Sequence, residues 1–303
     1  MGNVLHIFDV STFVHAGHVN KSSKLETLEK VGATWRTKVT PTGGVSLLFN
    51  KLYELVGKGD LVFCCDRLPT IKKDMFEGYK GNRKNKQEVT IEKRVAEYIL
   101  QECGCSVIAR AGYEADDIIY SLVQKFHDSY DHIYLHLNDS DLYFLVDDKV
   151  SVKPASSSGK EVTMENFEHV AVKGGCRYNN VTISKIMSGD TSDNIPPLPP
   201  AIRKKFRENM SIEEFYPYYG NKDFVKQWVE RLVPEALDQV DLVFPLQIDD
   251  IPDSFSIPDK QMVMNFGDAI NNRLFKNRGV VDFDVTPYTV AMQSQGLYIE
   301  EEI

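Results

Sequence analysis

The chain has 303 residues, of which 42% are hydrophobic and 26% are charged, and its formal net charge is −9 at pH 7. This composition is typical of a globular protein with one large domain or two smaller ones. The sequence has no apolar run of about 18 residues, which argues against a membrane span, and no basic leader, which argues against a secretory signal. Five cysteines without a C-x-x-C pair indicate a reducing cytoplasm.

Four short apolar runs predict buried strands, and each run leads into an acidic residue. The runs are “VLHIFD”, “LVFCCD”, “CSVIARAGYE” and “HIYLHLND”, and they lead to Asp9, Asp66, Glu114 and Asp139. A single aspartate at the end of a strand is usually the N-cap of the next helix, so the interpretation rests on the repetition.

Segments of helical period lie between these runs, at residues 43–59 and 90–104. In the second segment we expect Thr90 to cap the helix and Gly104 to end it. Strands that alternate with helices predict an α/β fold with a mostly parallel central sheet flanked by helices.

The domain organisation follows from a change of pattern along the chain. Residues 153–163 predict a hairpin turn between short strands, and beyond about residue 183 the pattern is mainly helical, with a proline-rich break at 196–200. We therefore expect an α/β domain at residues 1–185 and a helical domain at residues 186–303.

Positive charge is concentrated in two places, although the net charge disfavours a nucleic-acid partner. Residues 67–94 hold nine Lys and Arg against four Asp and Glu, and “RKKFR” spans residues 203–207. A solvated surface explains either run by itself, and a binding surface for a phosphate backbone is the alternative.

Acidic residues gather in short motifs at strand ends and helix starts. “YEADD” is expected to open an amphipathic helix, “NDSDL” to form a turn and “SGDTSDN” to begin another helix. The helix dipole explains one or two of these carboxylates. In a parallel sheet the carboxyl ends of the strands meet at one edge, so these carboxylates are expected to lie close together. Oxygen ligands without His or Cys favour Mg²⁺ or Mn²⁺. Sites that cleave phosphodiesters in this way hold two such ions. The candidate metal ligands are Asp9, Asp66, Glu114, Asp116, Asp117, Asp139, Asp141, Asp190 and Asp193.

Six motifs occur in a fixed order over nearly the first 195 residues. They are “FDV”, “CCD”, “YKGNR”, “YEADD”, “NDSDL” and “GDTSDNI”. In this combination the chain resembles the 5′-nuclease superfamily, the flap endonucleases and 5′ to 3′ exonucleases of replication. The region after “DNI” is most similar to the bacteriophage RNase H group, which removes RNA primers and adjoining DNA. The resemblance implies a PIN-like nuclease domain followed by a helical DNA-binding domain.

The resemblance also implies roles for individual residues. Asp9, Asp66, Glu114, Asp116 and Asp139 match positions around the more catalytic metal, and Asp117, Asp141, Asp190 and Asp193 match those around the second. Asp116 and Asp139 are further expected to act in catalysis. Lys80 and Arg83 match catalytic cations at the foot of a helical arch at about residues 67–95. The expected nucleic-acid contacts are Tyr79, Lys80, Arg83, Lys84, Arg203, Lys204, Lys205 and Arg207.

Two of these expectations, for Tyr79 and for the contact with duplex DNA, have alternatives. Tyr79 either stacks on a base or packs within the arch. After “DNIP” the family has glycine-rich turns whose N–H groups hold duplex phosphates and a monovalent cation, but Pro197 and Pro200 stand near those positions and have no N–H. Side chains of “RKKFR” are then expected to bind the duplex, unless they pair with nearby glutamates.

The function expected from these residues is a divalent-metal-dependent 5′ to 3′ exonuclease and flap endonuclease. It would act on branched or nicked DNA and on RNA/DNA hybrids, as a monomer without a membrane partner, in the cytoplasm of a bacterial host if phage-encoded. A sliding clamp or a single-strand-binding protein is a further candidate partner. The alternatives are a phosphomonoesterase of another α/β fold and a non-catalytic replication scaffold.

Overall fold

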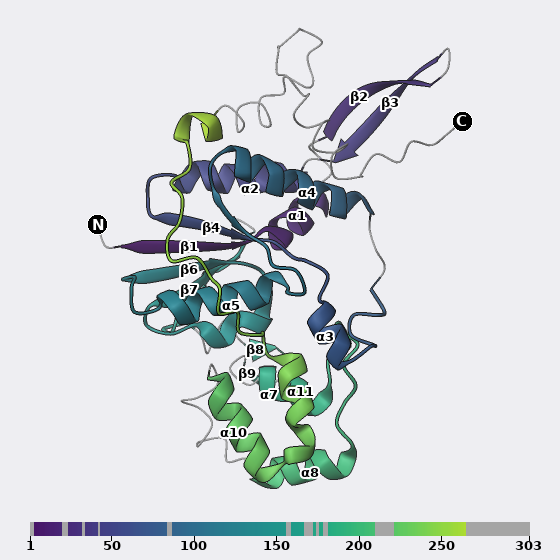
Figure 1. The fold of residues 1–303 in the computed structure, drawn as a ribbon, viewed down its shortest axis with the longest axis vertical. Helices are drawn as coiled ribbons and strands as arrows, with labels where there is room; N and C mark the ends of the chain where they lie inside the picture. The colour runs from purple at the N-terminus through teal and green to yellow at the C-terminus, as the bar shows by residue number, and fades with distance from the viewer. Residues whose placement is uncertain are drawn as a thin grey trace. The chain divides into compact units, whose positions relative to one another are not determined.

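The structure is a computed structural model (Figure 1). The chain divides into two units, each built from separate segments. Unit 1 comprises Met1–Val4, Asp66–Lys84 and Ala109–Pro252, and unit 2 comprises Leu5–Cys65, Asn85–Ile108 and Asp253–Ile303. The domain boundary at residue 185 stays a prediction. The residues that the structure describes are 3–19, 24–31, 34–41, 43–83, 87–155, 159–166, 172–173, 176–177, 181–209 and 221–264.

Unit 2 contains three parallel strands in the order β5-β4-β1. They are β1 (Val4–Asp9), β4 (Asp60–Cys64) and β5 (Ser106–Ile108). Phe8 and Phe63, in register on neighbouring strands, are fully buried and stack with their ring centroids 4.6 Å apart. The expected strands are therefore confirmed, and burial of their apolar side chains holds them together.

Three helices of unit 2 pack against one another: α1 (Val10–Val19), α2 (Gly43–Leu55) and α4 (Gln87–Glu102). Because α4 begins at Gln87, the prediction that Thr90 caps it is wrong; the helical pattern extends one turn further back. Gly104 ends the helix as expected, with a φ of +73° and hydrogen bonds from its N–H and that of Cys105 back to the last turn.

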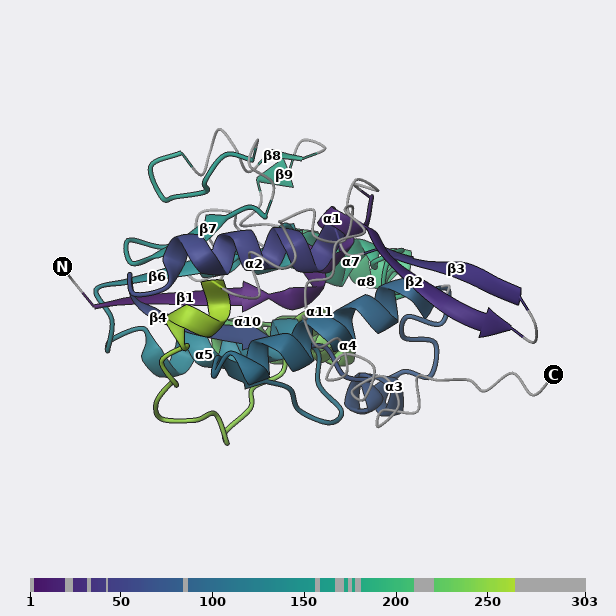
Figure 2. The ribbon, with the colours of Figure 1, turned by 90° about the horizontal axis from the view of Figure 1, so that it is seen from above.

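A hairpin of β2 (Lys24–Val31) and β3 (Thr34–Pro41) also belongs to unit 2 (Figure 2). The two strands are antiparallel, with Lys24 opposite Pro41 and Val31 opposite Thr34. The sequence patterns did not predict this pair.

Unit 1 contains the parallel strands β6 (His132–His136) and β7 (Val150–Lys153), together with α5 (Ala115–Phe126) and the 3₁₀ helix η1 (Ser140–Leu145). Val152 and Val162 exchange hydrogen bonds of 2.9 Å, which confirms that the chain reverses between residues 153 and 163. Parallel strands alternating with helices confirm the predicted α/β class.

The rest of unit 1 is mainly helical beyond residue 181, as expected (Figure 1). Phe206 and Trp228 pack edge to face between two of these helices, with centroids 5.1 Å apart. Within the described residues, no helix is both long and apolar enough to cross a membrane. The remaining elements are α3 (Thr70–Met75), β8 (Val172–Lys173), β9 (Cys176–Arg177), α7 (Val181–Ser188), α8 (Pro200–Asn209), α10 (Lys222–Leu232), η4 (Pro234–Ala236) and α11 (Leu237–Val243).

Candidate active site

The motif “YEADD” forms the start of α5, and its acidic residues cap the helix. The side chain of Glu114 accepts a hydrogen bond from the backbone N–H of Asp117, and the side chain of Asp117 accepts one of 2.9 Å from the N–H of Glu114. This reciprocal capping box satisfies donors that a helix otherwise leaves unpaired, which is why the chain turns helical here. Asp116 lies in the same first turn and is half-buried.

Asp117 is 0% exposed and is surrounded by donors. Besides the N–H of Glu114, its carboxylate accepts a 2.7 Å hydrogen bond from the N–H of Leu246 and forms a 3.3 Å ion pair with Lys72. Lys72, on α3, is itself only 4% exposed and lies 3.8 Å from Glu114. The sequence did not indicate a buried ion pair at Lys72, because lysine is usually exposed and is seldom buried unless paired.

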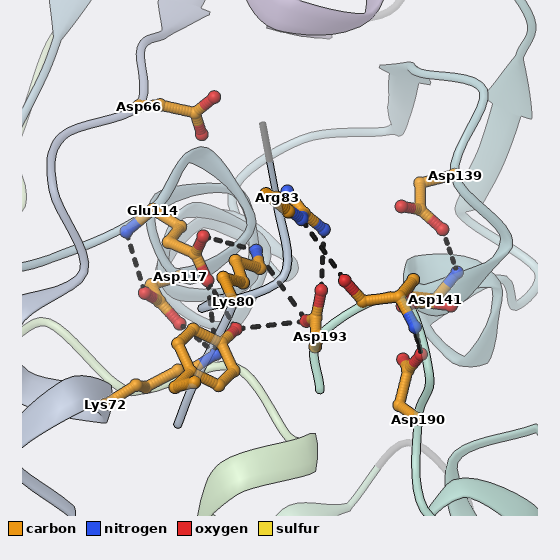
Figure 3. A network of polar contacts seen from close by, with 12 residues as sticks. Asp66, Lys72, Lys80, Arg83, Glu114, Asp117, Asp139, Asp141, Asp190 and Asp193 are labelled. Carbon is orange, nitrogen blue, oxygen red and sulfur yellow. Dashed lines mark hydrogen bonds and ion pairs between the residues drawn. The ribbon is translucent and has the colours of Figure 1, made fainter. Parts of the chain in front are cut away.

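The “YKGNR” motif meets Glu114 and Asp193 (Figure 3). Tyr79 is 1% exposed, and its hydroxyl oxygen lies 2.7 Å from Glu114 Oε2 and 3.1 Å from Asp193 Oδ2. Burial and the charges of the two carboxylates raise the pKa of Tyr79, so its hydroxyl stays protonated and donates. The ring is closed off from solvent, which favours the packed alternative over base stacking.

Lys80 and Arg83 contribute the cations of this group. Lys80 forms an ion pair with Glu114 and lies 3.6 Å from Asp193. Burial alone lowers the pKa of Lys80, but the two carboxylates outweigh that effect and raise it. Arg83 is 54% exposed at its side chain and lies 2.6 Å from Asp193 Oδ1, whereas Lys84 is outside the described residues.

Two residues beside these contacts have left-handed backbones, Lys80 with φ +53° and Asn194 with φ +59°. They are the non-glycine residues with positive φ in the described part of the chain. The N–H of Lys80 donates to the carbonyl of Asp193 at 2.8 Å, and Asn194 Nδ2 donates to the carbonyl of Gly78 at 2.7 Å. Such conformations cost roughly 1–3 kcal/mol each and recur at functional sites. These bonds fix “YKGNR” against “TSDN”.

Asp190 and Asp193 do not begin a helix, so that expectation is wrong. Gly189, at φ +74°, follows α7, and the chain then forms a turn closed by hydrogen bonds of 2.9 and 2.8 Å between Asp190 and Ile195. The left-handed glycine ends the helix before the aspartates, which therefore lie on a tight turn.

A second cation, Lys185 on α7, lies between Asp141 and Asp190. Lys185 Nζ is 2.6 Å from Asp190 and forms a further ion pair with Asp141. Burial and the charge of Asp139 raise the pKa of Asp141 to about 6, against the opposing effect of Lys185. The sequence analysis did not identify Lys185, although it lies five residues before Asp190, on the helix that leads into the turn.

The other predicted carboxylates take capping roles. Asp66 Oδ1 accepts a 3.0 Å hydrogen bond from the N–H of Ala115, and Asp139 Oδ1 accepts one of 3.0 Å from the N–H of Asp141. Asp9 belongs to unit 2, where it ends β1 and accepts hydrogen bonds from Ser11 and Thr12 at the start of α1. That geometry matches the N-cap explanation for Asp9.

The structure thus groups most of the predicted ligands in unit 1 with lysines and an arginine among them (Figure 3). Among the residues described, no three His, Cys, Asp or Glu side chains converge into a preformed metal site. The donor set is nevertheless all oxygen, and Asp141 already has a raised pKa beside Asp139. Crowded carboxylates of this kind fit a hard divalent cation, which removes their mutual repulsion.

A separate basic pocket lies on α8. A cavity of about 350 Å³ is lined by Pro200, Arg203, Lys204, Arg207 and Glu208. Lys204 lies 3.7 Å from Glu208, and Lys205 lies 3.2 Å from Glu235. In the described part of the chain, Arg203 Nε is buried without a hydrogen-bond partner.

Comparison with known proteins gives the family. The model of the 5′-3′ exonuclease, N-terminal resolvase-like domain, matches residues 5–173. The chain belongs to this family. It is 33% identical over 164 residues to a 5′-3′ exonuclease of Bacillus subtilis, covering 52% of the chain and 54% of that protein. It is 31% identical over 174 residues to DNA polymerase I of Caldicellulosiruptor bescii, covering 55% of the chain and 20% of that protein. The match thus spans about half of the length of the exonuclease and a fifth of the length of the polymerase.

Solved structures share the fold. The T5 D15 protein, co-crystallised with metal ions, has a TM-score of 0.53 at 15% identity, covering 89% of this chain and 99% of that one. The D15 flap endonuclease of bacteriophage T5, in a complex with DNA and metal ions, has a TM-score of 0.52 at 17% identity, covering 96% of this chain and 100% of that one. At these identities the likeness concerns the fold, and it agrees with the predicted PIN-like architecture.

Proposed function

We propose that the protein is a divalent-metal-dependent 5′ nuclease that hydrolyses phosphodiesters in branched or nicked DNA and in RNA/DNA hybrids. The observation that carries the proposal is the carboxylate group of unit 1, held on turns and one helix end and interleaved with Lys80, Arg83 and Lys185. Membership of the 5′-3′ exonuclease family supports it. The expected alternatives, a phosphomonoesterase and a scaffold, have no comparable support.

The residues proposed to hold Mg²⁺ or Mn²⁺ lie at these turns and belong to two sets. Glu114 and Asp116, with Asp66 and Asp139, would hold the more catalytic ion, and Asp141, Asp190 and Asp193 the second. The family resemblance also assigns Asp9, which belongs to unit 2, to the first set and Asp117 to the second. Bound divalent cations would supply an activated water and stabilisation of the leaving oxygen. Fixing these carboxylates by capping bonds and ion pairs before substrate arrives limits the reorganisation that binding requires.

Lys80 and Arg83 are proposed to contact the scissile phosphate. Both already face carboxylates of the site, and a bound phosphate would compete with Glu114 and Asp193 for the same cations. Arg83 is the more exposed of the two and suits capture of the incoming strand, whereas Lys80 is held by its left-handed backbone and suits charge stabilisation in the transition state.

The α8 pocket is proposed to bind the duplex backbone. Pro197 and Pro200 lack N–H groups, so the contact would pass to side chains, of which Arg203 and Arg207 line the pocket. Lys204, which also lines the pocket, and Lys205 lie on the same helix but have acidic partners, Glu208 and Glu235. The chain would act as a monomer, and a sliding clamp or single-strand-binding protein remains a proposed partner of the segment beyond residue 264.

Product analysis tests the proposal. Purified protein is incubated with 5′-labelled flap, nicked and RNA/DNA hybrid substrates, in Mg²⁺, Mn²⁺ or EDTA. We expect short 5′ products in either metal and none in EDTA. Release of inorganic phosphate alone would instead support the phosphomonoesterase, and binding without cleavage in both metals would support the scaffold.

A further inference from the structure

Asp117 differs from the other carboxylates of the site in how fully its side chain is engaged. Three donors surround it: the N–H of Glu114 at 2.9 Å, the N–H of Leu246 at 2.7 Å and Lys72 Nζ at 3.3 Å. The side chain is fully buried. Three donors take most of the roughly four acceptor positions of the carboxylate, so a metal ion would compete with them, and leaving one of these buried donors unsatisfied costs roughly 1–3 kcal/mol, more for a charged one.

The donor from Leu246 belongs to an extended segment, the α5 strap, defined here as residues 244–251. Ser121 Oγ accepts a 2.8 Å hydrogen bond from the N–H of Ile248, and Lys125 Nζ bonds the carbonyl of Ile251. The strap thus follows one side of α5 (Figure 1), and its contact with Asp117 fixes the end of the helix that carries the site. Two independent elements, α3 through Lys72 and the strap, meet at this one carboxylate.

The Lys72 side continues to the substrate-facing residues. Lys72 Nζ lies 3.8 Å from Glu114 and 5.7 Å from the centroid of the Tyr79 ring. Tyr79 in turn contacts Glu114, and the residue after it is Lys80. Lys72 thus contacts Glu114, which in turn pairs with Lys80, and Asp117 is the nearer of the two carboxylates beside Lys72.

We propose that Asp117 and Lys72 form a buried positioning pair that orients Glu114 and Lys80, and that Asp117 is not a metal ligand. The inference rests on the proposed function, since it concerns how that site is held in place. It reassigns Asp117, which the family resemblance places at the second metal. Its distinctive consequence is that neutralising Asp117 damages the fold and the turnover rate, while the number of bound metal ions stays that of the wild type.

The test uses the full chain and compares Asp117→Asn with Asp116→Asn, a matched change one position away on the same helix end. Mn²⁺ alone is titrated and followed by electron paramagnetic resonance. We expect Asp117→Asn to keep the wild-type number of bound Mn²⁺ ions and to weaken their binding less than Asp116→Asn, which should lose at least about tenfold, because Asp117 acts on the ligand Glu114 only through its position. A tenfold loss in Asp117→Asn with an unchanged unfolding equilibrium would overturn the proposal.

Unfolding in EDTA supplies a readout without metal. Asp117→Asn places an amide N–H₂ against one of the two backbone donors and leaves Lys72 with Glu114 alone among the described carboxylates, at 3.8 Å, so its unfolding equilibrium constant should rise at least tenfold, about 1.4 kcal/mol. Lys72→Met alone should do the same, and the double variant should show coupling between the two changes. Strict additivity would refute the pair. If Asp117→Asn does not fold, Lys72→Met and Lys72→Arg carry the test.

Kinetics separate positioning from stability. At a temperature where Lys72→Met is fully folded, we expect its kcat to fall about tenfold or more with KM changed less than threefold, and Lys72→Arg to recover most of that loss. Unchanged kcat in folded Lys72→Met would reduce the pair to a structural contact and refute the positioning role. If the wild type neither binds Mn²⁺ nor cleaves, the proposed function fails, while the coupling in EDTA still reports on the pair.

Discussion

Replacing Tyr79 by phenylalanine removes one hydroxyl from the centre of the candidate site. That hydroxyl is buried between Glu114 Oε2 at 2.7 Å and Asp193 Oδ2 at 3.1 Å, and the raised pKa of Tyr79 keeps its proton in place at neutral pH. A hydrogen bond to a charged group contributes about 1.5–3 kcal/mol. Since Lys80 still pairs with both carboxylates, we expect Tyr79→Phe to lower the free energy of unfolding by about 2 kcal/mol.

The assay is equilibrium unfolding in urea with EDTA present, so that no metal screens the carboxylates. With a slope of roughly 2 kcal/mol per molar urea, the midpoint should fall by about 1 M. Tyr53→Phe is the control, because the Tyr53 side chain is 53% exposed and its loss should change stability by less than about 0.5 kcal/mol. If Tyr79→Phe unfolds at the same midpoint as that control, the hydroxyl does not hold Glu114 and Asp193 in place.

Three further predictions concern charge. Burial alone lowers the pKa of His127, but the contacts with Asp128 and Asp147 outweigh that effect and raise it. The stabilising positive charge of His127 is therefore present at acidic pH and is lost as the pH rises through that pKa. In urea unfolding, His127→Gln should lower the free energy of unfolding by about 0.2–1 kcal/mol at pH 5.5 and by less at pH 8.5. Lys80→Ala should slow single-turnover cleavage about 100-fold with little change in substrate Kd, and the reverse pattern would assign Lys80 to binding alone. Arg203→Ala with Arg207→Ala should flatten the salt dependence of duplex binding by roughly one to two units, whereas an unaltered slope would place the duplex elsewhere.

The parts of the site that follow local rules were predictable from sequence. “YEADD” has the spacing of a capping box, and the structure starts α5 there. The parallel strands were predictable because runs such as “VLHIFD” are mostly apolar, as is typical of strands buried on both faces. Gly104 ended its helix as expected because it is the residue type that adopts positive φ most readily.

The contacts between distant segments were not predictable. Lys72 and Lys185 look like surface lysines, and their burial beside carboxylates depends on how α3 and α7 pack. The contact between Asp117 and Leu246 joins residues far apart in the chain, and no local pattern encodes it. “SGDTSDN” was interpreted as a helix start because its aspartates suit an N-cap, whereas the left-handed Gly189 makes it a turn.

We propose that the carboxylates of unit 1 perform metal-dependent cleavage. Asp139→Asn is the sharpest test of this role, because asparagine keeps an oxygen that can accept the 3.0 Å hydrogen bond from the N–H of Asp141 and removes the negative charge. The measurement is the single-turnover rate on a 5′-labelled flap in Mg²⁺, with substrate Kd determined in parallel. We predict that cleavage falls to background while Kd stays near that of the wild type. Wild-type turnover by Asp139→Asn would contradict metal-dependent cleavage at these carboxylates.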